Sequence, residues 1–178
     1  SDTLGGTASW SGGAMWAPIN HHLQEAGGGD TREAALAYMR SCAEGRADEA
    51  VFTTYLDHAG EVVRYLESAT PLRFEMGTMP DYQGGRPGGM YREGFSRSIA
   101  PEIFNIGRLG ENAALLRRSP YGTMPFGFQE FSRMNAVIHP ERIDAKLFAD
   151  RIEAGWLGWG EALTAPLVLA LIERGVEL

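Results

Sequence analysis

A run of glycine and hydroxyl residues close to the start of this 178-residue chain constrains its fold more than any other feature. Residues 5–18 read GGTASWSGGAMWAP, with four glycines in the first nine positions. Glycine lets the backbone approach a ligand closely, and the hydroxyls and backbone amides between the glycines can hydrogen-bond phosphate groups or ring heteroatoms. The same residue types are common in ordinary loops. The run therefore predicts a loop that either binds a nucleotide cofactor or only connects two elements.

The composition argues against several classes of protein. The formal net charge is −7, and the Lys and Arg residues are scattered along the chain. Because binding to a nucleic-acid backbone needs clustered basic residues, we expect no nucleic-acid partner. The sequence contains no Walker-type Gly-Lys-Ser/Thr, no G-x-S-x-G and no H-E-x-x-H motif. The common kinase and hydrolase classes are therefore not favoured.

We expect no membrane span and no secretory leader. The longest apolar run, residues 162–172, is shorter than the roughly 18 to 20 residues that cross a bilayer. No charged and then apolar segment opens the chain. The single cysteine, Cys42, cannot form an internal disulfide, and its helical pattern favours a small buried hydrophobe over a reactive thiol. These features predict a soluble, cytoplasmic protein.

The histidines are not expected to bind a metal. His21 and His22 are adjacent, so their side chains should diverge in a helix or a strand, and His58 and His139 stand alone. His21 is better interpreted as a polar residue that lines the loop.

Two helices are predicted after the glycine-rich run. Asp30 and Glu33 have the spacing of a capping box, with Asp30 as the N-cap, for a helix over residues 31–43. Apolar residues then recur at three- and four-residue steps over residues 48–69. This second helix should end before Pro71, because the residue before proline disfavours helix.

The rest of the chain predicts a helix-rich α+β fold in a single domain over residues 1–178. The expected elements are a strand at 72–75, helices at 109–117, 140–155 and 161–173, and a final strand at 176–178 that would add to a sheet formed by other sequence. Residues 76–106 lack periodicity and are rich in Gly, Pro, Met and aromatic residues. They predict either an exposed connector or, as we favour, a long loop that is buried or faces a cofactor. We expect about five helices and a small antiparallel β pair.

Three segments together resemble a known enzyme family. They are residues 5–18, the Met-Pro-Asp-Tyr sequence at 79–82 and the Gly-Arg-Pro-Gly-Gly sequence at 85–89. They are similar to the flavin-dependent 3-ketosteroid Δ1-dehydrogenases, within the fumarate reductase/succinate dehydrogenase flavoprotein superfamily. Residues 160–163 and 171–176 resemble a helix that leads into a strand of the FAD domain, whereas residues 95–159 show little similarity.

The resemblance implies FAD as the cofactor and this chain as part of a Rossmann-like FAD-binding domain. Residues 1–29 would be the flavin-contacting loop and residues 30–178 a helical insertion. The family also has a G-x-G-x-x-G turn and an acidic ribose-binding residue that these 178 residues lack. A remainder of the same FAD domain, or another chain, is therefore an expected partner.

The resemblance also implies particular cofactor-binding and substrate-binding residues. Backbone donation to the pyrophosphate and ribitol is expected from the matching loop, with Ser11 near the flavin ring. The matching loop residues are Gly6, Thr7, Ser11, Gly12 and Gly13. Trp16 and Pro18 should shape the wall of the pocket, with Trp16 toward the substrate. Ile19 and then Asn20 depart from the family, which often has Asn directly after the proline.

Tyr82 is the candidate catalytic residue. In the family, the tyrosine of the Pro-Asp-Tyr motif supports a second tyrosine that removes a proton from the steroid ring while the flavin takes hydride. A phenol, with a pKa near 10, needs such a neighbouring hydroxyl to act as a base. The second tyrosine belongs to sequence that this chain lacks, so the chain alone is not expected to turn over. The alternative for Tyr82 is an ordinary loop tyrosine. Arg86 remains open between pairing with a phosphate or a carboxylate and being solvated.

Three functions follow from these observations. The first is a fragment of a flavin-dependent oxidoreductase that acts on a small-molecule, steroid-like ketone. The second is a fumarate-reductase-like flavoprotein that reduces an unsaturated acid. The third is a helical binding or interaction domain, derived from a flavoprotein, without catalysis.

Overall fold

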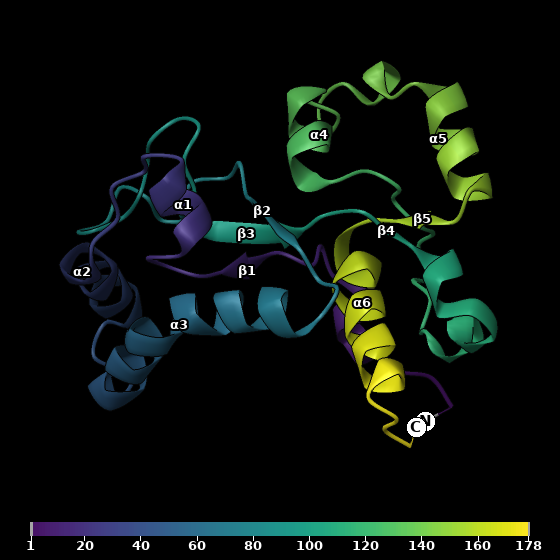
Figure 1. Cartoon of the computed structure of the whole chain (residues 1–178). Coiled ribbons are helices and arrows are strands. Elements are labelled where there is room, and N and C mark those ends of the chain that lie inside the picture. The colour runs from purple at the N-terminus through teal and green to yellow at the C-terminus, as the bar shows by residue number, and fades with distance from the viewer. Residues whose placement is uncertain (1, 178) are drawn as a thin grey trace. The chain divides into compact units, whose positions relative to one another are not determined.

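The computed structural model describes residues 2–177 and confirms the predicted helix-rich α+β fold (Figure 1). Two compact units form along the chain. The first contains the chain up to Ala14, residues 67–75 and the chain from Ala100 onward; the second contains Met15–Leu66 and Met76–Ile99.

The helices and strands alternate irregularly along the chain. The helices are η1 (Gly6–Trp10), α1 (His21–Glu25), α2 (Arg32–Ala43), α3 (Glu49–Ala69), η2 (Ile106–Leu115), α4 (Phe128–Arg133), η3 (Pro140–Arg142), α5 (Ala145–Glu153) and α6 (Trp159–Glu173), where η marks a 3-10 helix. The strands are β1 (Met15–Trp16), β2 (Phe74–Met76), β3 (Ser98–Pro101), β4 (Phe104–Asn105) and β5 (Trp156–Leu157).

The strands form two small sheets. The order of the three-stranded sheet is β1-β3-β2, and β1 and β3 are antiparallel, with Met15 opposite Ile99. The other sheet is an antiparallel pair in which Phe104 of β4 lies opposite Leu157 of β5. β3 and β4 lie inside the segment that was predicted to be a loop, residues 76–106. That prediction was wrong there because strands of two to four residues are too short to show a period.

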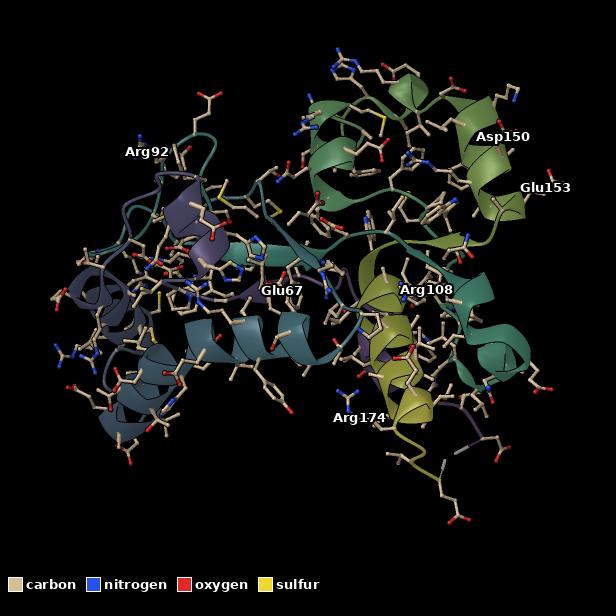
Figure 2. The ribbon with its side chains drawn as sticks, viewed as in Figure 1. Glu67, Arg92, Arg108, Asp150, Glu153 and Arg174 are labelled. Atoms are coloured by element: carbon tan, nitrogen blue, oxygen red, sulfur yellow. The ribbon has the colours of Figure 1, made fainter. Side chains whose placement is uncertain are left out.

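The first unit has its apolar core between α6, η2 and the β4/β5 pair. The buried side chains of this core are Phe104, Leu109, Leu116, Leu157, Ala162, Ala165, Val168 and Leu169. Arg108, labelled in Figure 2, places its guanidinium 4.9 Å from the centre of the Phe104 ring. This cation–π contact covers one edge of the core.

The second unit is built on the packing of α2 against α3. Buried Ala35, Leu36 and Leu56 form its small apolar cluster. Arg32 and Asp57 form an ion pair between the two helices at 2.6 Å. The two helices begin and end close to the predicted positions because their apolar periodicity is strong.

The N-cap of α2 is Thr31, so the predicted capping role of Asp30 was wrong. Thr31 Oγ1 accepts a hydrogen bond from Ala34 N at 3.2 Å. The Asp30 carboxylate instead accepts from Arg97 and from Ile19 N. A buried ion pair thus takes the carboxylate that a local capping box would have used.

The helix predicted over residues 140–155 is interrupted. Asp144 Oδ1 accepts hydrogen bonds from Lys146 N at 2.8 Å and Leu147 N at 3.0 Å, which starts α5 as a separate helix after η3. The helix predicted at 109–117 is the 3-10 helix η2, in which Gly110 has a positive φ of 56° that breaks the α-helical path.

Val176 and Glu177 are not assigned to a strand, and Leu178 lies outside the described residues. Because the expected partner sheet belongs to other sequence, the final strand stays a prediction. Gly175 has a φ of 67°, and Val176 N donates to the Leu171 carbonyl at 3.1 Å. The chain therefore ends α6 with a glycine C-cap.

The side chains of the adjacent histidines do not diverge as predicted. The imidazole rings of His21 and His22 lie 4.1 Å apart at the start of α1. Adjacent helical residues are separated by only about 100° around the axis, and flexible side chains can bridge this angle. Cys42 is half-buried on α2 rather than fully buried. Over residues 2–177, no helix is both long enough and apolar enough to cross a bilayer.

Candidate functional site

The five predicted cofactor residues lie together in one short loop of the first unit. The loop turns at Gly5, with φ 110°, and at Gly13, with φ 74°, on either side of η1. Ser11 Oγ donates to the Ala8 carbonyl at 2.8 Å and accepts from Gly13 N at 3.0 Å. The Ser11 hydroxyl therefore stabilises the loop itself.

One face of this loop packs closely on the start of α6. Gly160 N donates to the Ser11 carbonyl at 3.0 Å. A methyl group on Gly160 would lie 2.1 Å from the Ala8 carbonyl oxygen, and one on Gly13 would lie 2.6 Å from the Trp159 carbonyl. Both glycines are therefore required by packing.

The other face of the loop is open. Gly6, Thr7 and Ser11 are exposed. A methyl group on Gly6 would meet no protein atom within 4 Å, although the φ of 52° favours glycine. Gly12 is half-buried, and a methyl group there would reach only ordinary contact, 3.4 Å from the Phe128 ring. Hydroxyls, backbone amides and unfilled space on this face fit the needs of a phosphate-bearing cofactor.

The other two predicted site residues, Trp16 and Tyr82, belong to the second unit. The Trp16 indole stacks on the Tyr55 ring, with centroids 6.1 Å apart and planes 12° apart. Its Nε1 donates to Asp81 Oδ1 at 2.7 Å. The ring of Trp16 is thus fixed on both its face and its edge.

Tyr82 has no packed ring, because 92% of the residue is exposed. It borders an open hollow of about 430 Å³, whose lining is Met79, Pro80, Asp81, Tyr82, Gln83, Gly84, Gly85, Arg86 and Tyr91. Tyr91 is also largely exposed. Two phenols and a methionine therefore face a space large enough for a small ring compound.

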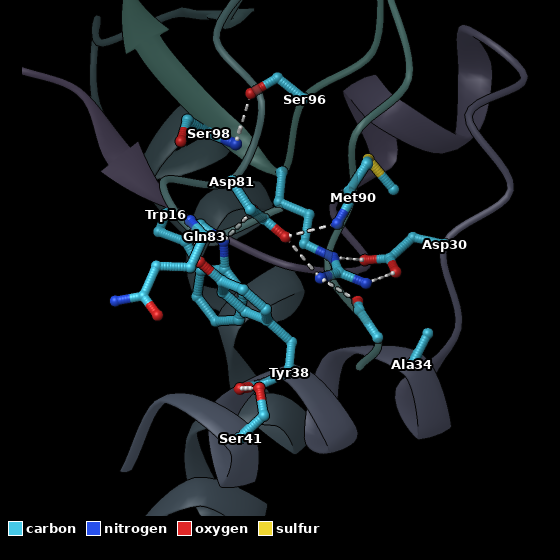
Figure 3. A network of polar contacts seen from close by, with 12 residues as sticks. Trp16, Asp30, Ala34, Tyr38, Ser41, Asp81, Gln83, Met90, Ser96 and Ser98 are labelled. Atoms are coloured by element: carbon cyan, nitrogen blue, oxygen red, sulfur yellow. Dashed lines mark hydrogen bonds and ion pairs between the residues drawn. The ribbon is translucent and has the colours of Figure 1, made fainter. Parts of the chain in front are cut away.

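A buried ion network lies behind this hollow and was missed from the sequence (Figure 3). Arg97 is 1% exposed. Its Nη2 and Nε donate to Asp30 at 2.7 and 3.1 Å, and its Nη1 donates to Asp81 Oδ2 at 2.7 Å. Two carboxylates around one guanidinium leave one net negative charge among them. No local signal marks Arg97, since it stands between two serines next to a short strand.

Arg86 pairs with a carboxylate, which is one of the two alternatives that the sequence left open. Its Nη2 donates to Glu44 Oε1 at 2.9 Å, and its Nη1 donates to the Ser41 carbonyl. A methyl group on Gly88 would lie 2.0 Å from the Ala34 carbonyl oxygen. The glycine-rich segment is thus held tightly on α2.

Two phenols of the second unit serve as hydrogen-bonding groups. Burial raises the pKa of Tyr38, whose hydroxyl accepts from Gln83 N at 3.2 Å. Burial likewise raises the pKa of Tyr55, whose hydroxyl donates to the Trp16 carbonyl. Both side chains therefore remain neutral and support the residues next to the hollow.

Comparison with known proteins identifies the class of protein. A family model described as FAD binding domain matches residues 1–175, so the chain belongs to this family. The predicted cofactor, FAD, is the cofactor of the family. The predicted resemblance is confirmed, and it also includes residues 95–159, for which little similarity was expected.

The relatives are dehydrogenases of oxo-substituted ring compounds by name. The chain is 36% identical to 4-oxocyclohexanecarboxylate 2-dehydrogenase of Sinomonas cyclohexanicum, over 98% of this chain and 29% of that protein. It is 31% identical to 3-oxosteroid 1-dehydrogenase of Mycobacterium tuberculosis, over 98% of this chain and 32% of that protein.

A solved structure supports the same grouping. The match is 3-ketosteroid delta1-dehydrogenase from Sterolibacterium denitrificans in complex with 1,4-androstadiene-3,17-dione, with a TM-score of 0.80 and 28% identity. It covers 100% of this chain and 34% of that one. The chain spans about a third of the length of the proteins that it matches.

Proposed function

We propose that the chain is part of an FAD-dependent dehydrogenase that oxidises a cyclic ketone and forms a carbon–carbon double bond beside the carbonyl. The observation that carries this proposal is the exposed phenol of Tyr82 at the edge of a hollow. The tyrosine belongs to the Pro-Asp-Tyr sequence on which the resemblance rests. The names of the relatives, which describe dehydrogenation of oxo-substituted rings, support the same reaction.

The cofactor would be held at the open face of the glycine loop. Gly6 offers room for close approach, and the Thr7 and Ser11 side chains are exposed beside it. Gly12 and Gly13 continue the loop, with Gly13 serving mainly to pack it on α6. When bound, FAD would supply the oxidant that accepts hydride from the substrate ring.

Tyr82 and Trp16 would act on the substrate side. The Tyr82 hydroxyl would donate a hydrogen bond to the catalytic base, a second tyrosine outside this chain. This bond would stabilise the anion of that tyrosine, which removes the proton beside the ketone. Trp16 would give the ring compound a flat apolar wall. Neither role requires a metal ion.

The substrate class can be tested with the full-length protein that contains this chain. It would be assayed for reduction of an artificial electron acceptor with 4-oxocyclohexanecarboxylate and with a 3-oxosteroid. We expect turnover of at least one of these ring ketones. The Tyr82→Phe variant should lose about 100-fold in kcat, in the range expected for a group that assists proton transfer.

A matched variant separates the phenol of Tyr82 from general changes in the hollow. Tyr91→Phe removes a hydroxyl from a second exposed tyrosine of the same lining and should change kcat less than twofold. A flavin-loaded protein that reduces fumarate but oxidises neither ketone would replace this proposal with the fumarate-reductase alternative. A full-length protein that binds no flavin would favour the non-catalytic binding domain.

A further inference from the structure

Asp81 connects the two residues of the second unit that the proposed function uses. Its Oδ1 accepts the indole N–H of Trp16 at 2.7 Å (Figure 3). Tyr82 is the next residue in the chain. The Asp81 side chain is buried, whereas the Tyr82 phenol is exposed. Although Asp81 belongs to the lining of the hollow, its side chain is only 1% exposed, so a substrate there would meet the phenol rather than the carboxylate.

The same residue closes the segment that carries the phenol. Asp81 N donates to the Met90 carbonyl at 3.0 Å, and Met90 N donates to Asp81 Oδ2 at 2.8 Å. Residues 81–90 thus form a loop whose two ends are joined through one residue. Gly84 N also donates to the Asp81 carbonyl at 2.9 Å, which makes a turn around Tyr82.

Arg97 fixes the direction of the Asp81 carboxylate. Its Nη1 donates to Asp81 Oδ2 at 2.7 Å and to the Gly88 carbonyl at 2.9 Å. Its other side is held by Asp30. Because a buried carboxylate is stable only when it is paired and hydrogen-bonded, both oxygens of Asp81 are committed to this arrangement.

We infer that Asp81 is a positioning residue, which sets the place of the Tyr82 phenol relative to the Trp16 indole. This inference rests on the proposed function, in which Tyr82 assists proton transfer and Trp16 forms the pocket wall. The Asp81 carboxylate accepts hydrogen bonds from the Trp16 indole, from Met90 N and from Arg97. These bonds allow little movement of Tyr82, the residue that follows it. A shift of a reacting group by about 1 Å can cost about 100-fold in rate.

A double-mutant cycle in the flavin-loaded full-length protein tests this role. Asp81→Asn should lower kcat about 10- to 100-fold, with little change in KM for the ring ketone, because the carboxylate does not face the hollow. In the Tyr82→Phe background, the same change should have little further effect, since Asp81 acts through the phenol. An equal loss in both backgrounds would overturn the inference.

An exposed aspartate of the same unit provides the control. Asp57 forms an ion pair with Arg32 between α2 and α3, away from the lining of the hollow. Asp57→Asn removes the same charge and should leave kcat unchanged.

A spectroscopic readout does not depend on turnover. With 3-fluorotyrosine incorporated, the ¹⁹F resonance of Tyr82 is identified by its loss in Tyr82→Phe. Asp81→Asn should shift or broaden this resonance, and Asp57→Asn should leave it in place. A resonance that Asp81→Asn does not move would overturn the inference even if the protein oxidises ring ketones. A moved resonance in a protein that oxidises no ring ketone would overturn the proposed function instead.

If Asp81→Asn does not fold, Trp16→Phe tests the same connection. It removes the indole donor to Asp81 and keeps an aromatic ring on Tyr55, while Arg97 still pairs with the carboxylate. We expect a smaller loss of kcat, about 3- to 10-fold, which again largely disappears in the Tyr82→Phe background. Equal losses in both backgrounds would contradict the inference.

Discussion

The hydroxyl oxygens of Ser9 and Thr164 lie 2.8 Å apart in a buried hydrogen bond that joins η1 to α6. Thr164 Oγ1 is also 3.0 Å from the Gly160 carbonyl oxygen, to which it can donate. These contacts fix one face of the glycine loop on the helix. The opposite face, which includes Thr7, stays exposed and is the face that we propose for FAD.

The close approach of the loop to α6 makes Gly160 sensitive to substitution. In Gly160→Ala, the new methyl group would lie 2.1 Å from the Ala8 carbonyl oxygen, so the backbone must move. We expect a loss of about 1–3 kcal/mol in the free energy of unfolding, measured by denaturant unfolding. Gly85→Ala is the control, because a methyl group there meets no atom within 4 Å. Equal midpoints for the two variants would contradict the packing argument.

A buried carboxylate in the first turn of α6 holds the neighbouring loop in place. Glu161 accepts hydrogen bonds from Arg118 Nε at 2.7 Å, Thr123 Oγ1 at 2.6 Å and Ser119 N at 3.0 Å. Glu161→Gln leaves part of this network unsatisfied and should cost about 1–3 kcal/mol in thermal unfolding experiments. Glu173→Gln, an exposed change on the same helix, should leave stability unchanged. A melting temperature for Glu161→Gln equal to that of the control would refute a structural role.

The elements that the sequence predicts well are those whose signal is local. The apolar periodicity of α3 runs for 21 residues and predicts the helix directly. Gly5, Gly6 and Gly13 of the N-terminal loop each have a positive φ, a local requirement that favours glycine at these positions. By contrast, Asp30 was predicted as the N-cap of α2, but it pairs with Arg97, which is 67 positions away, and Thr31 caps the helix instead.

The candidate site could be predicted from the sequence only as a set of separate residues. The Pro-Asp-Tyr sequence draws attention to Tyr82, but nothing in it indicates that Asp81 is bonded to Trp16, 65 positions earlier. Such a pairing depends on which segments the fold brings together. Buried ion networks are therefore the part of a site that local patterns do not reveal.

Stability should depend on pH through Glu75. Burial raises the pKa of this carboxyl above its usual value of 4.5, although Gln129 N donates to Oε1 at 2.9 Å. A raised pKa in the folded state stabilises the protein below pH 4.5, and this contribution is lost as the pH rises through the folded-state pKa. Glu75→Gln keeps an oxygen acceptor without the charge, so its melting temperature relative to the native protein should increase from acidic to neutral pH.

The control for this pH effect is Glu153→Gln, at the exposed end of α5 (Figure 2). The rise in relative melting temperature from acidic to neutral pH should be larger for Glu75→Gln than for this exposed change. If the difference in melting temperature between Glu75→Gln and the native protein is constant with pH, burial does not raise the pKa of the Glu75 carboxyl.

The chain of 178 residues should not retain FAD by itself. It has no G-x-G-x-x-G sequence, and in dinucleotide-binding folds this turn holds the pyrophosphate at the start of a helix. The visible absorbance of flavin that elutes with the protein in gel filtration measures retention. We expect a colourless chain and a yellow full-length protein. A yellow chain with one flavin per molecule would mean that the open face of the loop is sufficient.

The open face of the glycine loop can be tested directly with two matched glycines in the full-length protein. Gly6 and Gly45 have positive φ values of 52° and 76°, and a methyl group on either meets no protein atom within 4 Å. Replacing each by alanine should therefore impose a similar backbone strain, about 1 kcal/mol. Only in Gly6→Ala would the methyl group occupy the space proposed for the cofactor, so this variant should bind FAD at least 10-fold more weakly, measured by flavin fluorescence titration. Equal FAD affinities for Gly6→Ala and Gly45→Ala would place the cofactor away from this face, because the methyl group on residue 6 would then not contact the flavin cofactor.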